Sequence, residues 1–298
     1  MRSTLASLLS SVLKNHSKLS AASIHTTKAY EATVLRQRNH PNEPIKLVIF
    51  DKDGTLTSFD SMWAPWCKEV ANQLQQKTGF DVSNEAYRSF NYDPVTGKIG
   101  KGPLAENTHA HVHTDLASIL SENYPFSYDE IYKIVFDVCK NLQSMKPVVE
   151  ATCDVTPVFS ALKDSNIKIA VCTSDNRKST MHALEDLKIS HFVDYVICGD
   201  DEHNTPKPAP DNVHFICTKL GVEEKHTAII GDTPTDTEMG KRSGLGLVIG
   251  VLSGVGDKSD LIPEADVIVH NVEKSLPLIL NPDLLTETSN GINNMGQN

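Results

Sequence analysis

The sequence lacks three features that mark special classes of protein. It has no apolar run of about 18 residues, the length that crosses a bilayer, so we expect no membrane insertion. Its six cysteines are scattered and none forms a CxxC pair, which excludes a zinc knuckle and a thioredoxin-type site. It has no excess of positive charge, because the net charge is −10, so we expect no nucleic-acid partner. What is present is a 298-residue chain of ordinary globular composition.

Acidic residues are almost absent from the first 40 positions. Six basic residues stand there against one acid, Glu31, so this segment carries +5 and the rest of the chain −15. Apolar residues from Leu5 to Leu13 recur at helical spacing between serines. An amphipathic, Ser-rich and acid-poor segment is typical of an organelle transit peptide, and a disordered surface extension is the alternative. We predict a leader over 1–40 and a mitochondrial matrix location, with a plastid or the cytoplasm as alternatives.

Short apolar runs recur along the rest of the chain and are apolar on both faces, as buried parallel strands are. They lie at 45–50, 167–172, 192–198, 227–230, 245–251 and 265–269. Helix-length segments separate them, at 157–163, 178–187, 210–220 and 235–242. This alternation predicts an α/β fold, a Rossmann-like, doubly wound parallel sheet.

One interval is too long for a simple crossover between strands. More than 100 residues separate the first two apolar runs, whereas a crossover needs about a dozen. Helix-like segments fill the interval at 63–78, 104–120 and 128–144. We therefore predict an inserted α-helical cap domain. The chain from residue 282 is polar, so we predict a disordered tail there. The predicted divisions are a core of 41–58 and 160–281, a cap of 59–159 and a disordered tail of 282–298.

The first apolar run leads into Asp51-Lys52-Asp53-Gly54-Thr55. Side chains two apart on a strand share a face, so Asp51 and Asp53 can point into one pocket. Two carboxylates this close repel each other unless a cation lies between them or one is protonated. Gly54 allows a sharp turn. Taken alone, the pentapeptide is also compatible with an acidic turn that caps a strand.

Three later loops carry further polar residues at or after the ends of apolar runs. Thr173 and Ser174 end the second run just before a predicted helix, where hydroxyl and N–H groups suit an anion. Lys207 stands among prolines that fix its backbone, although a solvated loop lysine is the alternative. Asp232 and Asp236 follow the fourth run, and Asp236 is also placed to cap the next helix.

These four motifs in this order resemble those of the haloacid dehalogenase superfamily, over residues 45–280. The insert after the first motif resembles the helical C1-type cap of the phosphoglycolate phosphatase-like branch. The resemblance implies a Mg²⁺-dependent phosphatase that acts on a small phosphorylated metabolite, with phosphoglycolate as the best single candidate. A phosphomutase of the same superfamily is the alternative enzyme, and a non-catalytic import or scaffold protein is the alternative outside enzymes. The sequence does not decide the oligomeric state.

The resemblance also implies roles for individual residues. Asp51 is the nucleophile that forms an aspartyl-phosphate, Asp53 is the general acid and base, and Thr173 and Lys207 hold phosphoryl oxygens. The implied magnesium ligands are Asp51, Asp232, Asp236 and, through its backbone carbonyl, Asp53. The implied phosphate-binding residues are Gly54, Thr55, Thr173, Ser174, Lys207 and, on the cap, Lys101.

Two features of the insert have competing interpretations. Lys101 lies in a basic, glycine-rich loop, 97–103, which either contacts a second anionic group of the substrate or is a plain exposed loop. His109, His111 and His113 recur at every second position. Closely spaced histidines can bind zinc, but we expect these on the cap surface.

Overall fold

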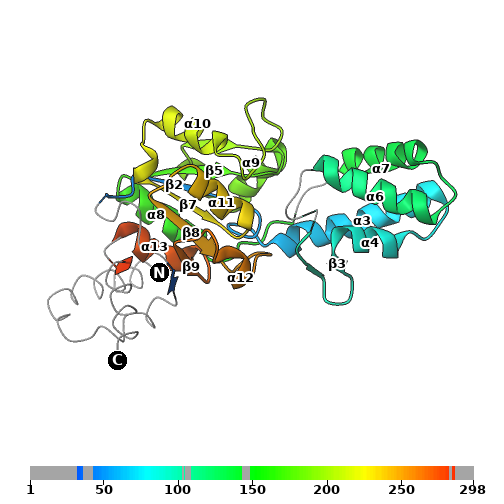
Figure 1. The fold of residues 1–298 in the computed structure, drawn as a ribbon, viewed down its shortest axis with the longest axis horizontal. Coiled ribbons are helices and arrows are strands. Elements are labelled where there is room, and N and C mark those ends of the chain that lie inside the picture. Colours follow the sequence, from blue (N-terminus) through cyan, green and yellow to red (C-terminus); the bar gives the residue numbers. More distant parts are fainter. Residues whose placement is uncertain are drawn as a thin grey trace.

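The protein was analysed as a computed structural model, and the structure describes residues 32–35, 43–102, 104, 109–142, 148–281 and 284–285. These residues form a core built on a β-sheet and a cap built mainly of helices, joined at one end of the sheet (Figure 1). Of the predicted leader 1–40 the structure describes only residues 32–35, and of the predicted tail 282–298 only residues 284–285; the rest of both lies outside the described part of the chain.

A seven-stranded sheet in the order β1-β9-β8-β7-β2-β5-β6 forms the centre of the core. Six strands run parallel, and β1 pairs with β9 in the antiparallel sense at one edge. The strands are β1 (Thr33–Val34), β2 (Leu47–Phe50), β5 (Lys168–Cys172), β6 (Tyr195–Ile197), β7 (Thr227–Gly231), β8 (Leu247–Val251) and β9 (Val267–Val269). The predicted α/β fold is therefore confirmed, with a parallel strand at each of the six apolar runs.

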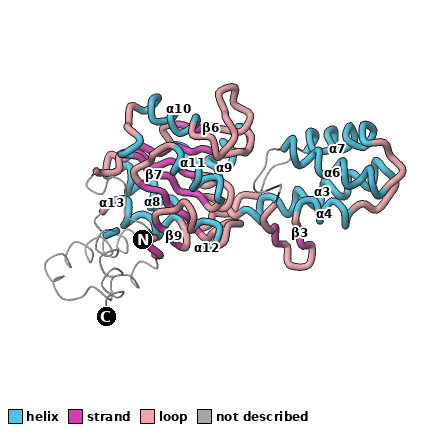
Figure 2. The backbone as a smooth tube through the Cα atoms, in the orientation of Figure 1, coloured by secondary structure: helices cyan, strands magenta, loops and turns pink. Residues whose placement is uncertain are grey.

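Helices cover both faces of this sheet, as Figure 2 shows. They are α8 (Val155–Asp164), α9 (Arg177–Asp186), α10 (Asp211–Leu220), α11 (Pro234–Arg242), α12 (Lys258–Leu261) and α13 (Val272–Leu280), with 3-10 turns at Ser190–Phe192 and Glu224–His226. Alternate residues of β2 face opposite ways. Val48 and Phe50 pack in the cluster that includes residues of α8 and α13, whereas Leu47 and Ile49 pack with residues of α10 and α11.

The register of the central strands brings their carboxyl ends together. Phe50, the last residue of β2, lies opposite Val171 of β5 on one side and Ile230 of β7 on the other. The residues that follow these strands therefore emerge at one edge of the sheet. Ligands bind at this edge in open α/β sheets.

The cap is inserted between β2 and α8 and has its own apolar core. It consists of α3 (Phe59–Thr78), α4 (Ser83–Phe90), a hairpin of β3 (Tyr92–Asp93) and β4 (Lys98–Ile99), α6 (His109–Asn123) and α7 (Tyr128–Leu142). The two connections to the core run side by side, because Ser58 donates its N–H to Glu150 O at 2.7 Å and Thr152 donates to Leu56 O at 3.1 Å. Among the described residues, no helix combines the length and the apolarity that a membrane span needs.

The structure differs from the predicted divisions at three places. Thr33 and Val34, within the predicted leader, form the edge strand β1. Helix α8 begins at Val155, within the range predicted as cap, because Val155 and Phe159 are buried in the core. Leu285, in the predicted disordered tail, is also buried there. Charge and polarity set the leader and tail boundaries in the sequence, and helix-like segments set the cap. In the structure, strand pairing with β9 and burial in the core place these residues.

Replacing Phe159 with Ala should lower the free energy of unfolding by about 3–5 kcal/mol, because a fully buried aromatic side chain is lost and a cavity remains. Its ring stacks on that of Phe50, with centroids 4.9 Å apart, next to the strand end that carries Asp51. Urea denaturation of the purified protein measures the loss. Val95→Ala is the control, because Val95 is 91% exposed and should change stability by about 0.5 kcal/mol at most. Similar losses in both variants would contradict this packing.

Candidate active site

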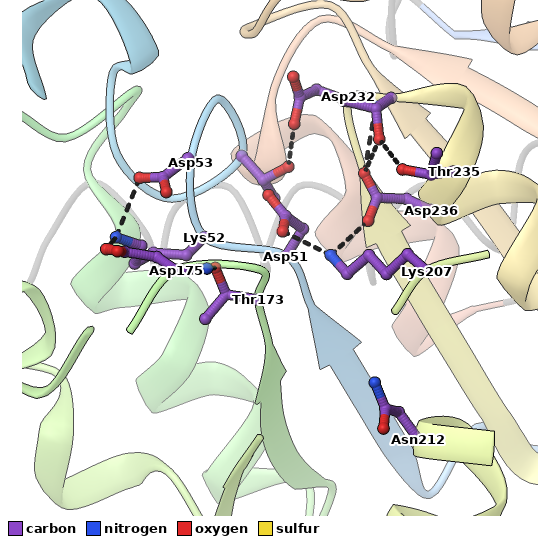
Figure 3. Close-up of polar contacts among 12 residues, drawn as sticks. Asp51, Lys52, Asp53, Thr173, Asp175, Lys207, Asn212, Asp232, Thr235 and Asp236 are labelled. Carbon is purple, nitrogen blue, oxygen red and sulfur yellow. Dashed lines mark hydrogen bonds and ion pairs between the residues drawn. The ribbon is translucent and has the colours of Figure 1, made fainter. Parts of the chain in front are cut away.

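Asp51 lies at the edge of the sheet where β2 ends. Its N–H donates to Ile230 O at 2.9 Å, which continues the pairing with β7 for one residue beyond the strand. Its carboxylate accepts a hydrogen bond of 2.6 Å from Lys207 Nζ, and the same ammonium donates to Asp236 Oδ1 at 2.6 Å (Figure 3). Lys207 therefore bridges two of the motifs that the sequence singled out, with its own side chain only 7% exposed.

Asp51, Asp232 and Asp236 form a buried acid triad. Each offers a carboxylate oxygen, and these oxygens lie within 4.8 Å of one another. Burial raises the pKa of Asp51 to about 7 even beside Lys207, and burial followed by repulsion from Asp51 and Asp236 raises the pKa of Asp232. The triad thus holds more negative charge than one lysine offsets. Closely spaced hard oxygen donors with unbalanced charge fit a divalent cation such as Mg²⁺.

The fully buried Asp232 is held from two sides. Its Oδ1 accepts from Thr55 Oγ1 at 3.1 Å and its Oδ2 accepts from the N–H of Val255 at 3.0 Å. Gly54 has φ +86°, and a Cβ there would lie 2.4 Å from Asp232 Oδ2. A Cβ on Gly254 would lie 1.9 Å from the same oxygen. Glycine is therefore required at both positions for the carboxylate to fit. Thr55, which was predicted to bind phosphate, instead has its hydroxyl on Asp232.

Asp236 both caps a helix and belongs to the acid triad, the two positions that its place in the sequence allowed. Its Oδ2 accepts from the N–H of Thr233 at 3.1 Å and from the Thr233 hydroxyl at 2.6 Å, in a capping box at the start of α11. Its Oδ1 faces Lys207. The capping box at the start of α11 fixes the Asp236 carboxylate, so that its Oδ1 points to Lys207.

Asp53 belongs to a second charged group that stands apart from the triad in Figure 3. Its Oδ1 accepts from Thr57 Oγ1 at 3.1 Å and pairs with Lys52 Nζ at 3.1 Å, and Lys52 also pairs with Asp175 Oδ2 at 2.5 Å. The largest influence on the pKa of Asp53 is burial, which raises it. The charge of Lys52 lowers this pKa and repulsion from Asp175 raises it, and the net result is a raised pKa. The carboxylate of Asp53 thus lies in this second group rather than within the triad. Its backbone carbonyl as a metal ligand stays a prediction.

The sequence analysis missed both Lys52 and Asp175. Lys52 has no exposed surface although it is charged, and such lysines are almost always paired. The signal was available, because a lysine directly after a buried strand and between two acids needs acceptors. What the sequence did not reveal was the partner, which is 123 residues away.

Core and cap together line a pocket over the triad. It encloses about 590 Å³ including its opening to solvent. Thr173 and Ser174 line it as expected, and Thr173 Oγ1 accepts from the N–H of Asp175 at 3.2 Å. The core contributes Asp51, Asp53, Thr173, Ser174, Asp175, Lys207, Thr233, Thr235 and Asp236, and the cap contributes Phe59, Trp63, Leu104 and Val112. The core thus lines the pocket mainly with polar groups, and the cap lines it with apolar ones.

Lys101 lies elsewhere, outside the set of described residues that line the pocket. Its Nζ pairs with Asp257 at 2.7 Å and with Asp260 at 2.5 Å, so it links the cap to α12 of the core. The prediction that placed Lys101 on the substrate is not supported by this arrangement, since two acids distant in sequence bind its ammonium.

The three histidines of the cap do not share one environment. His113 is 5% exposed and its ring lies edge-on to Phe136, with centroids 5.8 Å apart, so the expectation of a surface position is wrong for this residue. His111 is exposed. The side chain of His109 lies outside the described residues. Among the residues that the structure describes, the acid triad is the group with metal-site spacing.

A protein family and several curated proteins are similar to this chain. Residues 45–244 match the family model of haloacid dehalogenase-like hydrolases. A phosphoglycolate phosphatase of Aquifex aeolicus is 28% identical over 200 residues, which cover 67% of this chain and 82% of that protein. The pyrophosphatase PpaX of Oceanobacillus iheyensis is 24% identical, over 67% of this chain and 80% of that protein.

The solved structures support the same fold. A beta-phosphoglucomutase from Clostridium difficile superposes with a TM-score of 0.54 at 18% identity, over 82% of this chain and 98% of that one. At this identity the likeness concerns the fold alone. The family match spans β2, the cap and the strand ends that carry Asp51, Thr173, Lys207, Asp232 and Asp236. The chain therefore belongs to the haloacid dehalogenase-like hydrolases.

Proposed function

We propose that this hydrolase is a Mg²⁺-dependent phosphatase that cleaves a small phosphomonoester through an aspartyl-phosphate on Asp51. One observation carries the proposal: the carboxylate of Asp51 faces a pocket, is held by Lys207 at 2.6 Å, and belongs to the acid triad. A phosphomonoester dianion resists attack by another anion, so a carboxylate nucleophile needs positive charge beside it. Asp51 has that charge beside it.

In the first step an oxygen of Asp51 attacks phosphorus, and the bond from phosphorus to the ester oxygen breaks. Asp53 gives its proton to that oxygen, so the leaving group departs as a neutral alcohol. Lys207 and the hydroxyl groups of Thr173 and Ser174 hold the phosphoryl oxygens. Mg²⁺ held by Asp51, Asp232 and Asp236 would supply further positive charge against the phosphoryl group.

In the second step water replaces the enzyme carboxylate. Asp53, now ionised, takes a proton from a water molecule, which attacks the phosphorus of the aspartyl-phosphate. The bond between phosphorus and the Asp51 oxygen breaks, and inorganic phosphate leaves. The carboxylate of Asp51 and the proton on Asp53 are restored, so the cycle closes.

Phosphoglycolate is the substrate that we favour, on the strength of the relatives' names and the cap. The Aquifex relative is a phosphoglycolate phosphatase, and the pocket is lined by both cap and core, which limits the size of the substrate. A broad panel of phosphorylated metabolites, assayed for phosphate release with and without Mg²⁺, tests the proposal. Isomerisation of a sugar phosphate without net phosphate release would favour a phosphomutase instead. No reaction with any ester would favour a non-catalytic role.

Asp51→Asn should reduce kcat/KM for phosphate release by at least about a thousandfold, because the amide cannot serve as the nucleophile. Phosphate release under saturating Mg²⁺ is the measurement. The matched control is Asp164→Asn, an exposed residue at the end of α8, which should keep wild-type activity. Full activity of the Asp51 variant would rule out this nucleophile.

Binding of Mg²⁺ should weaken as the pH falls below about 7. Burial raises the pKa of Asp51 to about 7, so below that pH the carboxyl is increasingly protonated and a proton must leave before a metal binds. We expect the dissociation constant at pH 6 to be about fivefold higher than at pH 7, with little change above pH 8. Calorimetric titration of the metal-free protein with Mg²⁺ measures it. In Asp51→Asn the change in the dissociation constant between pH 7 and pH 6 should be smaller. A wild-type affinity for Mg²⁺ that does not depend on pH would contradict the prediction.

We also propose that the basic segment 1–40 is a mitochondrial address. The charge of +5 and the apolar periodicity support it. A fusion of residues 1–40 to a fluorescent protein should enter mitochondria, whereas a fusion with the six basic residues changed to Gln should not. Plastid or cytoplasmic fluorescence of the first fusion would replace this proposal with one of the alternatives.

A further inference from the structure

The buried lysine next to the nucleophile has no role in the steps above. Lys52 separates Asp51 from Asp53, yet its side chain has no exposed surface and does not reach the triad. Its ammonium contacts three groups: Asp175 Oδ2 at 2.5 Å, Asp53 Oδ1 at 3.1 Å and Met62 Sδ at 3.5 Å. An ammonium buried so completely is retained only where its partners are fixed around it.

Asp175 is the fixed end of this arrangement. Its Oδ1 accepts from the N–H of Asn176 at 2.7 Å and from Asn176 Nδ2 at 2.9 Å, at the start of α9. Its own N–H donates to the hydroxyl Oγ1 of Thr173, a residue that also lines the pocket. With one oxygen held by α9, the other oxygen fixes the position of the ammonium.

Asp53 is the end of the arrangement that lies at the pocket. Its Oδ1 is held between Lys52 Nζ and Thr57 Oγ1, each at 3.1 Å. Without the ammonium, the carboxylates of Asp53 and Asp175 would face each other uncompensated and would turn apart. Both residues line the pocket, so the position of Asp53 there depends on an ion pair that starts at α9.

We propose that Lys52 and Asp175 are a positioning pair that sets where the Asp53 carboxyl stands relative to the leaving-group oxygen. This inference rests on the proposed function, since it assigns a part in the proton transfer of that reaction. The pair touches neither phosphorus nor the leaving group, and it acts through Asp53. Its third contact, Met62, belongs to α3, so the same ammonium also meets the first helix of the cap.

A purely structural role for Lys52 makes a different prediction. In that case the lysine only neutralises a buried acid. Removing both members of the pair would then restore the activity and the stability that are lost when Lys52 alone is replaced. A positioning role predicts that stability returns while proton transfer to the leaving group stays impaired. The dependence of the rate on the basicity of the leaving group separates the two roles, because a good leaving group departs without a proton.

The test uses the double variant Lys52→Met/Asp175→Asn, which removes the charges as a pair. kcat/KM is measured with phenyl phosphate and p-nitrophenyl phosphate, which have nearly the same shape but leaving groups of different basicity. General acid catalysis contributes about 10²–10⁴-fold, so we expect the loss with phenyl phosphate to exceed that with p-nitrophenyl phosphate by about tenfold or more. Asp53→Asn should show the same inequality.

Two further variants keep the test decisive. Lys241→Met breaks another part-buried ion pair of the core, with Asp266, outside the pocket, and should cost stability without any such inequality. Asp175→Asn alone leaves Lys52 paired with Asp53 and serves if the double variant does not fold. It should also lose more kcat/KM with phenyl phosphate than with p-nitrophenyl phosphate, by a smaller factor. Equal losses with both esters in a folded Lys52 or Asp175 variant overturn the inference. A wild-type protein that releases phosphate neither from these esters nor from any member of the metabolite panel contradicts the proposed function itself, and the inference with it.

Discussion

The site depends on the bridge that Lys207 makes between Asp51 and Asp236. Five acids, Asp51, Asp53, Asp175, Asp232 and Asp236, surround one end of a buried sheet, where water does not screen their repulsion. Two buried lysines divide them into two groups, with Lys207 among the triad and Lys52 between Asp53 and Asp175. One group is left with excess negative charge that fits a metal, whereas the other is closer to balance and holds the carboxylate of Asp53 in place.

The fold supplies the precision that this charge arrangement needs. Register between β2, β5 and β7 aligns three strand ends, and glycine on both sides of Asp232 leaves room for its carboxylate alone. The cost is a cluster of acids with raised pKa values, which opposes folding in the absence of a cation. The rigid sheet and the stacked rings of Phe50 and Phe159 beneath it offset that cost.

Much of this arrangement could be predicted from the sequence, because it is local. Apolar runs predicted the six parallel strands, and the residues at their ends predicted Asp51, Thr173, Lys207, Asp232 and Asp236 at one edge. Contacts between distant segments could not be predicted in this way. Lys101 was expected at the substrate, but its partners Asp257 and Asp260 come from α12, and Lys52 was overlooked because its partner Asp175 is far along the chain. The charge of a residue is visible in a sequence, but the identity of its counter-ion is a property of the fold.

The short edge strand β1 has a consequence for processing of the chain. Thr33 and Val34 cover the outer edge of β9, whose backbone groups would otherwise be available to pair with another molecule. They stand only a few residues before the end of the segment with transit-peptide character. If the proposed leader is removed by proteolysis, only a cut before Thr33 keeps the edge of β9 covered. A cut after Val34 would remove β1 and leave that edge open to intermolecular β-pairing.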